Sequence, residues 1–353
     1  MRHTSLRSLA LTVLVGTIVC MHVRAANDPA AAAQTVQQGA QEAAKGAFPA
    51  RKVSDAFPLE TYPRVDCSTS AQPLAMLIGC RLTGAESRWV GAEGDRLLLA
   101  VALQHPDEAA AEAQKRVTLA RDLNDRIQHT GTNKAYVALI EGKQEVILVA
   151  RAPSDDELKL AKDQRVELDA RPVALDAFVF MVNKDHPATN LTTAQIQEIY
   201  TGKIKNWNEV GGPDQELHPY MRDRNSGSQE LMDRLVMKGE KMGPTFRAVE
   251  YSMSGPFMRL AKDNQALAYT VFFYAEHMAP RENSKLIAID GIMPTSETIR
   301  SRKYPHVADV FVVIRKDADP KGPAMRLRDW MLSPAGQGVV AESGYVPLPA
   351  SAK

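Results

Sequence analysis

Met221-Arg-Asp-Arg-Asn-Ser-Gly-Ser-Gln-Glu230 is a polar loop that runs directly into an amphipathic helix, because apolar residues recur at helical spacing from Leu231 to Val236. Either serine of the loop can cap this helix, and Gly239 can end it. The start of such a helix carries unpaired backbone N–H groups and the positive end of the helix dipole. Together with the two serine hydroxyls and the two arginines, these groups predict an oxyanion site. The alternative is an ordinary capped helix with solvated arginines.

Two further hydroxyl-rich turns occur in the first half of the chain. Ser68-Thr-Ser70 follows a strand that ends at Asp66, and it precedes a helix with Pro73 near its first turn. His129-Thr-Gly-Thr132 lies between a predicted helix over residues 107–128 and a further apolar segment. Both turns offer donors of the same kind as the 221–230 loop, although a simple serine cap is the alternative for the first of them.

Strands and helices alternate along the rest of the chain. Ser154 and Thr192 each begin a capping box, and Ser333-Pro334 is typical of a helix start. Two long apolar segments, residues 173–182 and 306–314, are similar in length and character, and we interpret them as strands that cross between two lobes. Shorter strands are predicted at residues 145–150, 266–273 and 285–290. The alternation indicates the α/β class.

Length and composition favour a protein with two lobes. The chain has 353 residues, of which 44% are hydrophobic, and this is enough to bury a large core. Its formal charge is +1, and it becomes −2 when residues 1–25, which carry three arginines and no acid, are removed. A nearly neutral protein lacks the excess positive charge that is typical of nucleic-acid-binding proteins. Any anion must therefore be bound by a local site.

Residues 1–25 have the pattern of a signal peptide. A basic region, a short apolar region and the cleavage site Val23-Arg-Ala25 follow one another. Cys20 leaves lipid attachment open, although a valine precedes it where a small residue is preferred. We therefore expect export to the periplasm, and the later apolar runs are too short to insert in a membrane. Residues 26–50 are rich in Ala and Gln, and we expect them to form a disordered leader.

Cysteine and histidine usage gives little support to catalysis or metal binding. A predicted helix separates Cys67 from Cys80 by roughly 20 Å, whereas a disulfide needs Cα atoms within about 7 Å. We therefore expect two free thiols. The 8 histidines are scattered without metal-ligand spacing, and the motifs of common hydrolases are absent from the sequence in a suitable context. We expect no cofactor, no metal and no enzymatic activity, with a secreted hydrolase as the less favoured alternative.

Several longer motifs occur in a characteristic order. They are Leu175-Asp-Ala-Phe-Val-Phe, Ile199-Tyr-Thr-Gly-Lys-Ile-Lys-Asn-Trp, Asn225-Ser-Gly-Ser-Gln-Glu230, Asp66-Cys-Ser-Thr-Ser and Ser343-Gly-Tyr-Val-Pro. In these motifs the chain resembles the phosphate-type solute-binding proteins of bacterial ABC transporters, and the resemblance covers residues 53–350. It implies a two-lobed type II periplasmic-binding-protein fold. Each lobe would be a mixed sheet flanked by helices, with two crossing strands as the hinge.

The resemblance also implies an oxyanion site that draws on both lobes. The candidate ligand-binding residues are Ser68, Thr69, Ser70, Thr130, Gly131, Thr132, Arg151, Arg222, Ser226, Gly227 and Ser228. Arg151 stands where known members have an Asp that accepts a hydrogen bond from the protonated oxygen of the oxyanion and so selects HPO₄²⁻ over sulfate. Arg224 stands where an acid is usual, and Cys67 where a glycine is usual. The carboxylates considered as replacements are Asp155, Asp156 and Asp176.

The function implied by the resemblance is the capture of inorganic phosphate, or of a similar tetrahedral oxyanion, and its delivery to a membrane ABC permease. An oxyanion sensor or scavenger without a transport role is the alternative. We expect residues 51–176 and 308–353 to form the first lobe and residues 177–307 the second. We further expect a monomer that binds no nucleic acid.

Overall fold

The computed structural model describes residues 57–91, 96–103, 108–224, 226–243, 249–279 and 281–349, together with 47–48 and 105. The predicted signal peptide, most of the predicted leader and Asn225 of the polar loop lie outside these ranges. The described residues belong to one compact unit that begins at Ala47.

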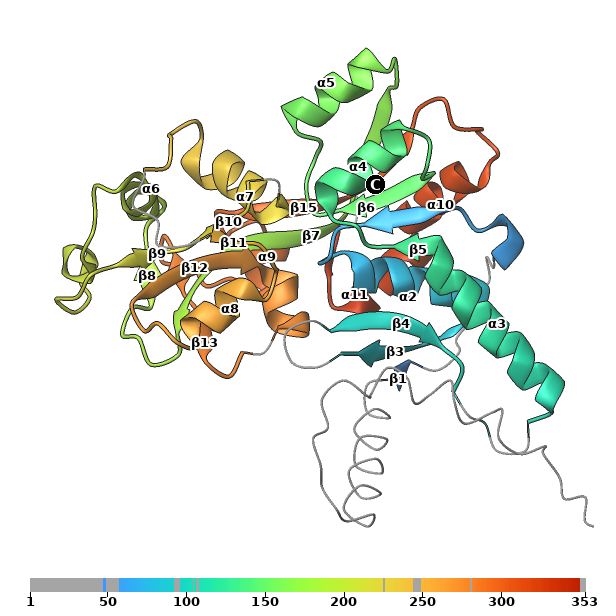
Figure 1. The fold of residues 1–353 in the computed structure, drawn as a ribbon, viewed down its shortest axis with the longest axis horizontal. Helices are drawn as coiled ribbons and strands as arrows, with labels where there is room; N and C mark the ends of the chain where they lie inside the picture. The colour runs from blue at the N-terminus through green and yellow to red at the C-terminus, as the bar shows by residue number, and fades with distance from the viewer. Residues whose placement is uncertain are drawn as a thin grey trace, which may run out of the picture. The chain divides into compact units, whose positions relative to one another are not determined.

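A mixed sheet of nine strands forms the centre of this unit (Figure 1). Its strand order is β5-β2-β6-β15-β7-β12-β9, and β13 and β16 also pair with β7. The strands are β2 (Val65–Cys67), β5 (Ile127–Gln128), β6 (Val146–Val149), β7 (Leu168–Asn183), β9 (His218–Pro219), β12 (Ala266–Val271), β13 (Ser284–Leu286), β15 (Val307–Arg315) and β16 (Val346–Pro347). The first three run parallel to one another, whereas β15 is antiparallel to both β6 and β7.

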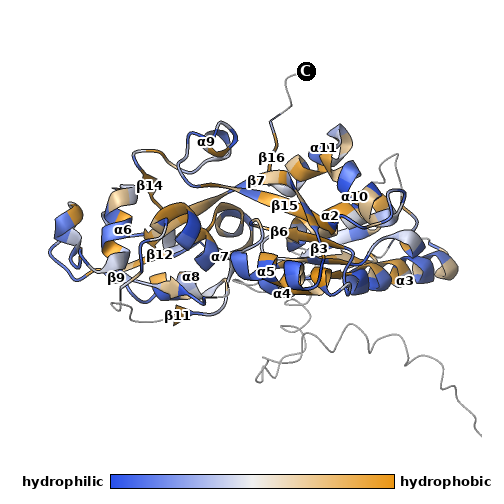
Figure 2. Ribbon diagram, turned by 90° about the horizontal axis from the view of Figure 1, so that it is seen from above, coloured by the Kyte–Doolittle hydropathy of each residue, from blue (hydrophilic) through white to orange (hydrophobic). Residues whose placement is uncertain are grey.

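The long strand β7 pairs with different neighbours along its length. From Leu168 to Ala177 it pairs with β15, and from Phe178 onward it pairs with β12 and β13. Every residue from Val173 to Asn183 is buried, as expected for a continuous apolar run that is covered on both faces. Figure 1 shows β7 running from the strands around β6 to those around β12, and Figure 2 shows hydrophobic residues concentrated on the central strands.

Helices alternate with these strands, and this confirms the predicted α/β class. They are α2 (Gln72–Thr83), α3 (Ala110–Arg126), α4 (Thr132–Ile140), α5 (Asp155–Asp163), α6 (Thr193–Thr201), α7 (Gly227–Leu231), α8 (Gly255–Leu260), α9 (Ser296–Arg300), α10 (Pro323–Leu332) and α11 (Pro334–Ser343). The capping boxes at Ser154 and Thr192 and the serine cap at Ser333 form as predicted. Helix α7 continues into one π-helical turn, Met232–Met237. The described part of the chain has no helix that is long and apolar enough to cross a bilayer.

A second, small sheet was not predicted. Strand β3 (Glu86–Val90) lies between β4 (Leu97–Val101) and β1 (Ala47–Phe48), with antiparallel pairing on both sides. The leader expected to be disordered over residues 26–50 therefore contributes a strand at its end. The physical reason is that β3 would otherwise expose the unpaired N–H and C=O groups of an edge strand.

Candidate anion-binding site

Asp66, at the end of β2, holds two of the predicted loops together. Its Oδ1 accepts hydrogen bonds from the backbone N–H groups of Cys67 at 2.8 Å and Thr130 at 2.9 Å. Its Oδ2 accepts a bond from the Thr130 hydroxyl at 2.6 Å. The carboxylate is almost fully buried, and it is satisfied by three donors from two segments that are distant in sequence. Asp66 therefore sets the position of the 130–132 turn relative to the Ser68–Ser70 loop.

Both loops lead into helices that begin beside them. Gly131 has a φ of 98°, which a side chain would rarely tolerate, and it is the N-cap residue of α4. The Ser68–Ser70 loop does not form the simple serine cap considered for α2, because no side chain caps that helix. The hydroxyl of Ser68 is instead buried without a hydrogen-bond partner among the described residues. An unsatisfied buried hydroxyl of this kind is suited to bind a ligand.

The C-terminal part of the chain contacts the Ser68–Ser70 loop through Tyr345. Tyr345 is buried, and its hydroxyl donates to the carbonyl oxygen of Ser70 at 2.7 Å. Its ring stacks on Phe273, with 3.9 Å between ring centroids and 1° between planes. The neighbouring Cys67 thiol donates to the Gln128 carbonyl at 2.9 Å. Burial raises the pKa of this thiol well above its usual value, which disfavours the reactive thiolate form. Cys67 and Cys80 are both free, as predicted, and both are buried.

Arg222 brings a buried positive charge to the opposite side of the site. It lies in β10 (Met221–Arg222), which pairs with β11 (Val249–Glu250). Its Nε donates to the carbonyl of Glu250 at 3.0 Å, and Nη2 donates to the carbonyl of Tyr251 at 3.4 Å. No described carboxylate forms an ion pair with it, and burial lowers the pKa of the guanidinium. A desolvated cation that forms no ion pair with a described carboxylate is suited to attract an anion.

The predicted helix start lies directly downstream of Arg222. Ser226 is the N-cap residue of α7, and its Oγ accepts a bond from the N–H of Gln229 at 3.1 Å. Ser228 is buried in the first turn, and an added Cβ on Gly227 would lie 2.8 Å from Oγ1 of Thr132. The α7 helix start and the α4 helix start therefore face one another closely.

These segments surround a cavity of about 650 Å³. All of the predicted site residues except Arg151 line it: Ser68, Thr69, Ser70, Thr130, Gly131, Thr132, Arg222, Ser226, Gly227 and Ser228. Hydroxyl groups, backbone N–H groups and one buried guanidinium thus converge on one space. Such a set of donors is chemically suited to an oxyanion.

Arg151 was predicted to contact the ligand, but it is not among the described residues that line the cavity. Its Nη1 and Nη2 atoms bind the two carboxylate oxygens of Glu157 at 2.7 and 2.8 Å. Both side chains are almost fully buried. A buried guanidinium with a bidentate carboxylate is already neutralised, so it has little charge left to offer an anion.

The acidic residues considered as oxyanion acceptors are also located elsewhere. Asp155 and Asp156 are exposed on α5. Asp176 is buried in β7, where its Oδ1 accepts bonds from the N–H groups of Ala177 and Phe273. Burial raises the pKa of Asp176 to about 7, although these backbone donors oppose the shift. Among the described residues, the acidic residue that lines the cavity is Asp223, in the same loop as Arg222.

Part of the cavity wall was not predicted from the sequence. The additional lining residues are Leu97, His129, Asn133, Lys134, Ala150, Asp223, Leu231, Tyr251, Ser252, Met253 and Val271. Several are immediate neighbours of predicted residues, so proximity in the sequence could have identified them. Leu97 and residues 251–253 come from distant segments and carry no such signal. The described ranges contain no group of three or more His, Cys, Asp or Glu residues suited to a metal.

Residues 92–335 match the model of the PBP superfamily domain, so the chain belongs to the PBP superfamily. The phosphate-binding protein PstS of Borreliella burgdorferi is 26% identical over 183 residues, which are 50% of this chain and 64% of that relative. The phosphate-binding protein PstS of Staphylococcus saprophyticus is 27% identical over 236 residues, which are 62% of this chain and 70% of that protein.

The fold is similar to that of a solved structure from Clostridium perfringens, assigned as a phosphate ABC transporter substrate-binding protein and containing bound phosphate. The TM-score is 0.58 at 20% sequence identity, and the match covers 81% of this chain and 98% of the other. The comparison confirms the periplasmic-binding-protein fold that the sequence motifs implied.

Proposed function

We propose that the chain is an exported solute-binding protein that captures inorganic phosphate, or a similar tetrahedral oxyanion, and delivers it to the permease of an ABC transporter. The observation that carries this proposal is Arg222, a buried cation without a described carboxylate partner in a wall of hydroxyl and N–H donors. An anion in the cavity would neutralise this charge and satisfy the Ser68 hydroxyl. Relatives named as phosphate-binding proteins support phosphate as the anion.

The proposed capture mechanism is closure of two lobes, residues 51–176 with 308–353 and residues 177–307. The change in β7 pairing between Ala177 and Phe178 supports a boundary at this point. Strands β7 and β15 would then act as the hinge. The donors come from both sides of this boundary, so a bound anion would hold the lobes together.

Asp223 is the acceptor that we propose for a protonated oxygen of the ligand, since its residue lines the cavity. A carboxylate can accept a hydrogen bond from HPO₄²⁻, whereas it repels sulfate, which has no proton to donate. Phosphate should therefore bind more tightly than sulfate, and Asp223→Asn should reduce the difference.

Titration calorimetry on refolded, ligand-stripped protein tests the proposal with phosphate, arsenate, sulfate and molybdate. Phosphate and arsenate should bind tightly and sulfate weakly. Equal affinity for sulfate and phosphate would contradict phosphate selectivity, and no binding of any of the four anions would contradict an oxyanion site. An adjacent permease gene in the source genome would support the transport role.

Binding without catalysis is the expected behaviour of this site. A phosphatase assay on the purified protein, without added metal, should show no turnover. Turnover that is abolished by Ser226→Ala would show instead that the cavity is an active site.

A further inference from the structure

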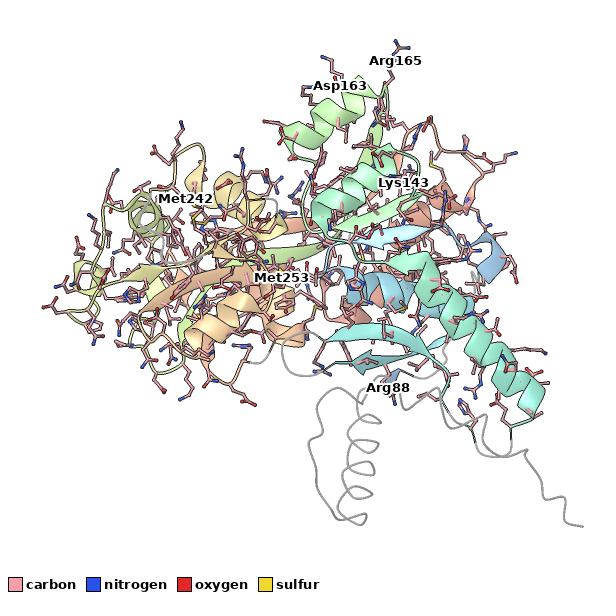
Figure 3. All side chains as sticks on the ribbon, viewed as in Figure 1. Arg88, Lys143, Asp163, Arg165, Met242 and Met253 are labelled. Atoms are coloured by element: carbon pink, nitrogen blue, oxygen red, sulfur yellow. The ribbon has the colours of Figure 1, made fainter. Side chains whose placement is uncertain are left out.

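The sulfur of Met253 occupies a position between two of the proposed anion donors. Its Sδ accepts a hydrogen bond from Nη1 of Arg222 at 3.3 Å and another from Oγ of Ser228 at 3.8 Å. Met253 lies in the loop between β11 and α8, is half-buried and lines the cavity. Figure 3 labels it near the centre of the molecule. A side chain of the protein therefore engages the groups that would otherwise bind the ligand.

The hydrogen bonds to the Met253 sulfur are weak because of the chemistry of a thioether acceptor. A thioether sulfur is a poor hydrogen-bond acceptor, whereas an anionic oxygen forms charge-assisted bonds that are roughly twice as strong as neutral ones. Methionine has three rotatable bonds and adapts easily to a new packing arrangement. An arriving oxyanion can thus displace the sulfur and take over both donors.

We propose that Met253 is an internal occupant of the anion site and that its oxidation closes the site. This inference rests on the proposed oxyanion function. In the reduced protein the thioether shields Arg222 until the anion replaces it. In the sulfoxide form, an S=O oxygen remains attached to the protein and competes with the anion for Arg222 and Ser228.

The chemical step requires a peroxide as co-reactant. A lone pair of the Met253 sulfur attacks one oxygen of hydrogen peroxide, the O–O bond breaks, and a new S–O bond forms. The sulfur is oxidised to the sulfoxide, and the peroxide is reduced to water once the departing hydroxide takes up the proton of the transferred oxygen. Because Met253 lines the cavity, a molecule of nearly the size of water can reach it.

Calorimetry with inorganic phosphate tests the proposal on full-length protein, before and after mild treatment with hydrogen peroxide. Peptide mass spectrometry would establish sulfoxide at residue 253. We expect oxidised wild type to bind phosphate about tenfold to one hundredfold more weakly. The reason is that the sulfoxide oxygen, a strong acceptor, would stay hydrogen-bonded to the charged guanidinium of Arg222. Met253→Leu keeps the volume and removes the acceptor. It should bind about twofold to tenfold more tightly than reduced wild type, and peroxide should not weaken its binding.

The matched control is Met258→Leu. Met258 lies on the neighbouring helix α8, is 58% exposed and does not line the cavity. This variant should bind phosphate like wild type and should remain sensitive to peroxide. Treatment with methionine sulfoxide reductase should restore binding to the oxidised wild type.

Two results would overturn the inference while leaving phosphate capture intact. One is unchanged phosphate affinity in protein that carries sulfoxide at residue 253. The other is equal or weaker binding by Met253→Leu than by reduced wild type. If neither untreated wild type nor Met253→Leu binds phosphate, the proposed function itself has failed.

Discussion

Gly227 and Thr132 approach so closely that a Cβ added to the glycine would lie 2.8 Å from the threonine Oγ1. Gly227 begins α7 and Thr132 begins α4, so the ends of two helices from distant parts of the chain meet at the cavity. Because both helix starts present N–H groups, this approach places donors from two segments beside one cavity.

Gly227→Ala should weaken phosphate binding about tenfold, or by about 1.4 kcal/mol. The added methyl group would push the Thr132 hydroxyl away and separate the two helix starts. The measurement is the phosphate Kd by calorimetry. Gly338→Ala is the control, since a Cβ there meets no atom within 4 Å. Unchanged affinity in Gly227→Ala would show that the close approach does not matter for binding.

Arg222→Met should weaken phosphate binding by about 1.5–3 kcal/mol, since a charge-assisted hydrogen bond is lost. The stability of the ligand-free protein should change little, because removing a buried cation that has no described ion-pair partner also removes its desolvation cost. Urea unfolding and calorimetry measure the two effects separately. Wild-type affinity in a folded Arg222→Met protein would mean that the anion binds elsewhere.

Arg151→Met should have the opposite pattern. It leaves Glu157 as an unpaired buried carboxylate, so the free energy of unfolding should fall by about 3–5 kcal/mol. The phosphate Kd of the folded protein should remain within about twofold of wild type, because Arg151 does not line the cavity. Adding Glu157→Gln should recover part of the stability. A large loss of phosphate affinity would instead restore Arg151 as a ligand residue.

Asp66→Asn tests whether this buried residue positions the Thr130 turn. The amide keeps one acceptor oxygen but places an NH₂ group where Oδ2 accepts from the Thr130 hydroxyl. Phosphate affinity should fall about threefold to tenfold. The amide resonance of Thr130 should shift in the ligand-free protein as well. If affinity falls while that resonance is unchanged, Asp66 acts in some way other than by holding the turn.

The pH dependence of stability should include a contribution from Asp176. Its pKa is raised by burial to about 7, above the ordinary value of 3.8. The folded state therefore keeps its proton while the unfolded chain loses it, and stability falls as pH rises from about 4 to about 7. Asp176→Asn should be progressively more stable than wild type across this range in urea unfolding. A pH-independent difference between the two proteins would show that Asp176 does not titrate there.

The local sequence was sufficient to predict those helix starts and strands whose stabilising interactions lie within a few residues. The caps at Ser154, Thr192 and Ser333 form as predicted because each depends on donors within three residues. The strand at 173–182 was predictable because an uninterrupted apolar run must be buried on both faces. The small sheet of β1, β3 and β4 was missed, since its pairing joins segments that carry no shared pattern.

The sequence by itself determined the α/β class, the helix starts and the hydroxyl-rich loops, because these depend on hydrogen bonds and periodicity over a few residues. Only the tertiary structure decided which groups line the cavity. Arg151 and Arg222 both precede or follow short polar loops, yet Glu157 neutralises Arg151, and Arg222 remains a buried cation beside the cavity. Met253 reaches the same cavity from a distant loop. The physical reason is that ion pairing and burial of a side chain depend on neighbours that packing brings together from distant segments. The spacing of residues along the chain does not predict either of them.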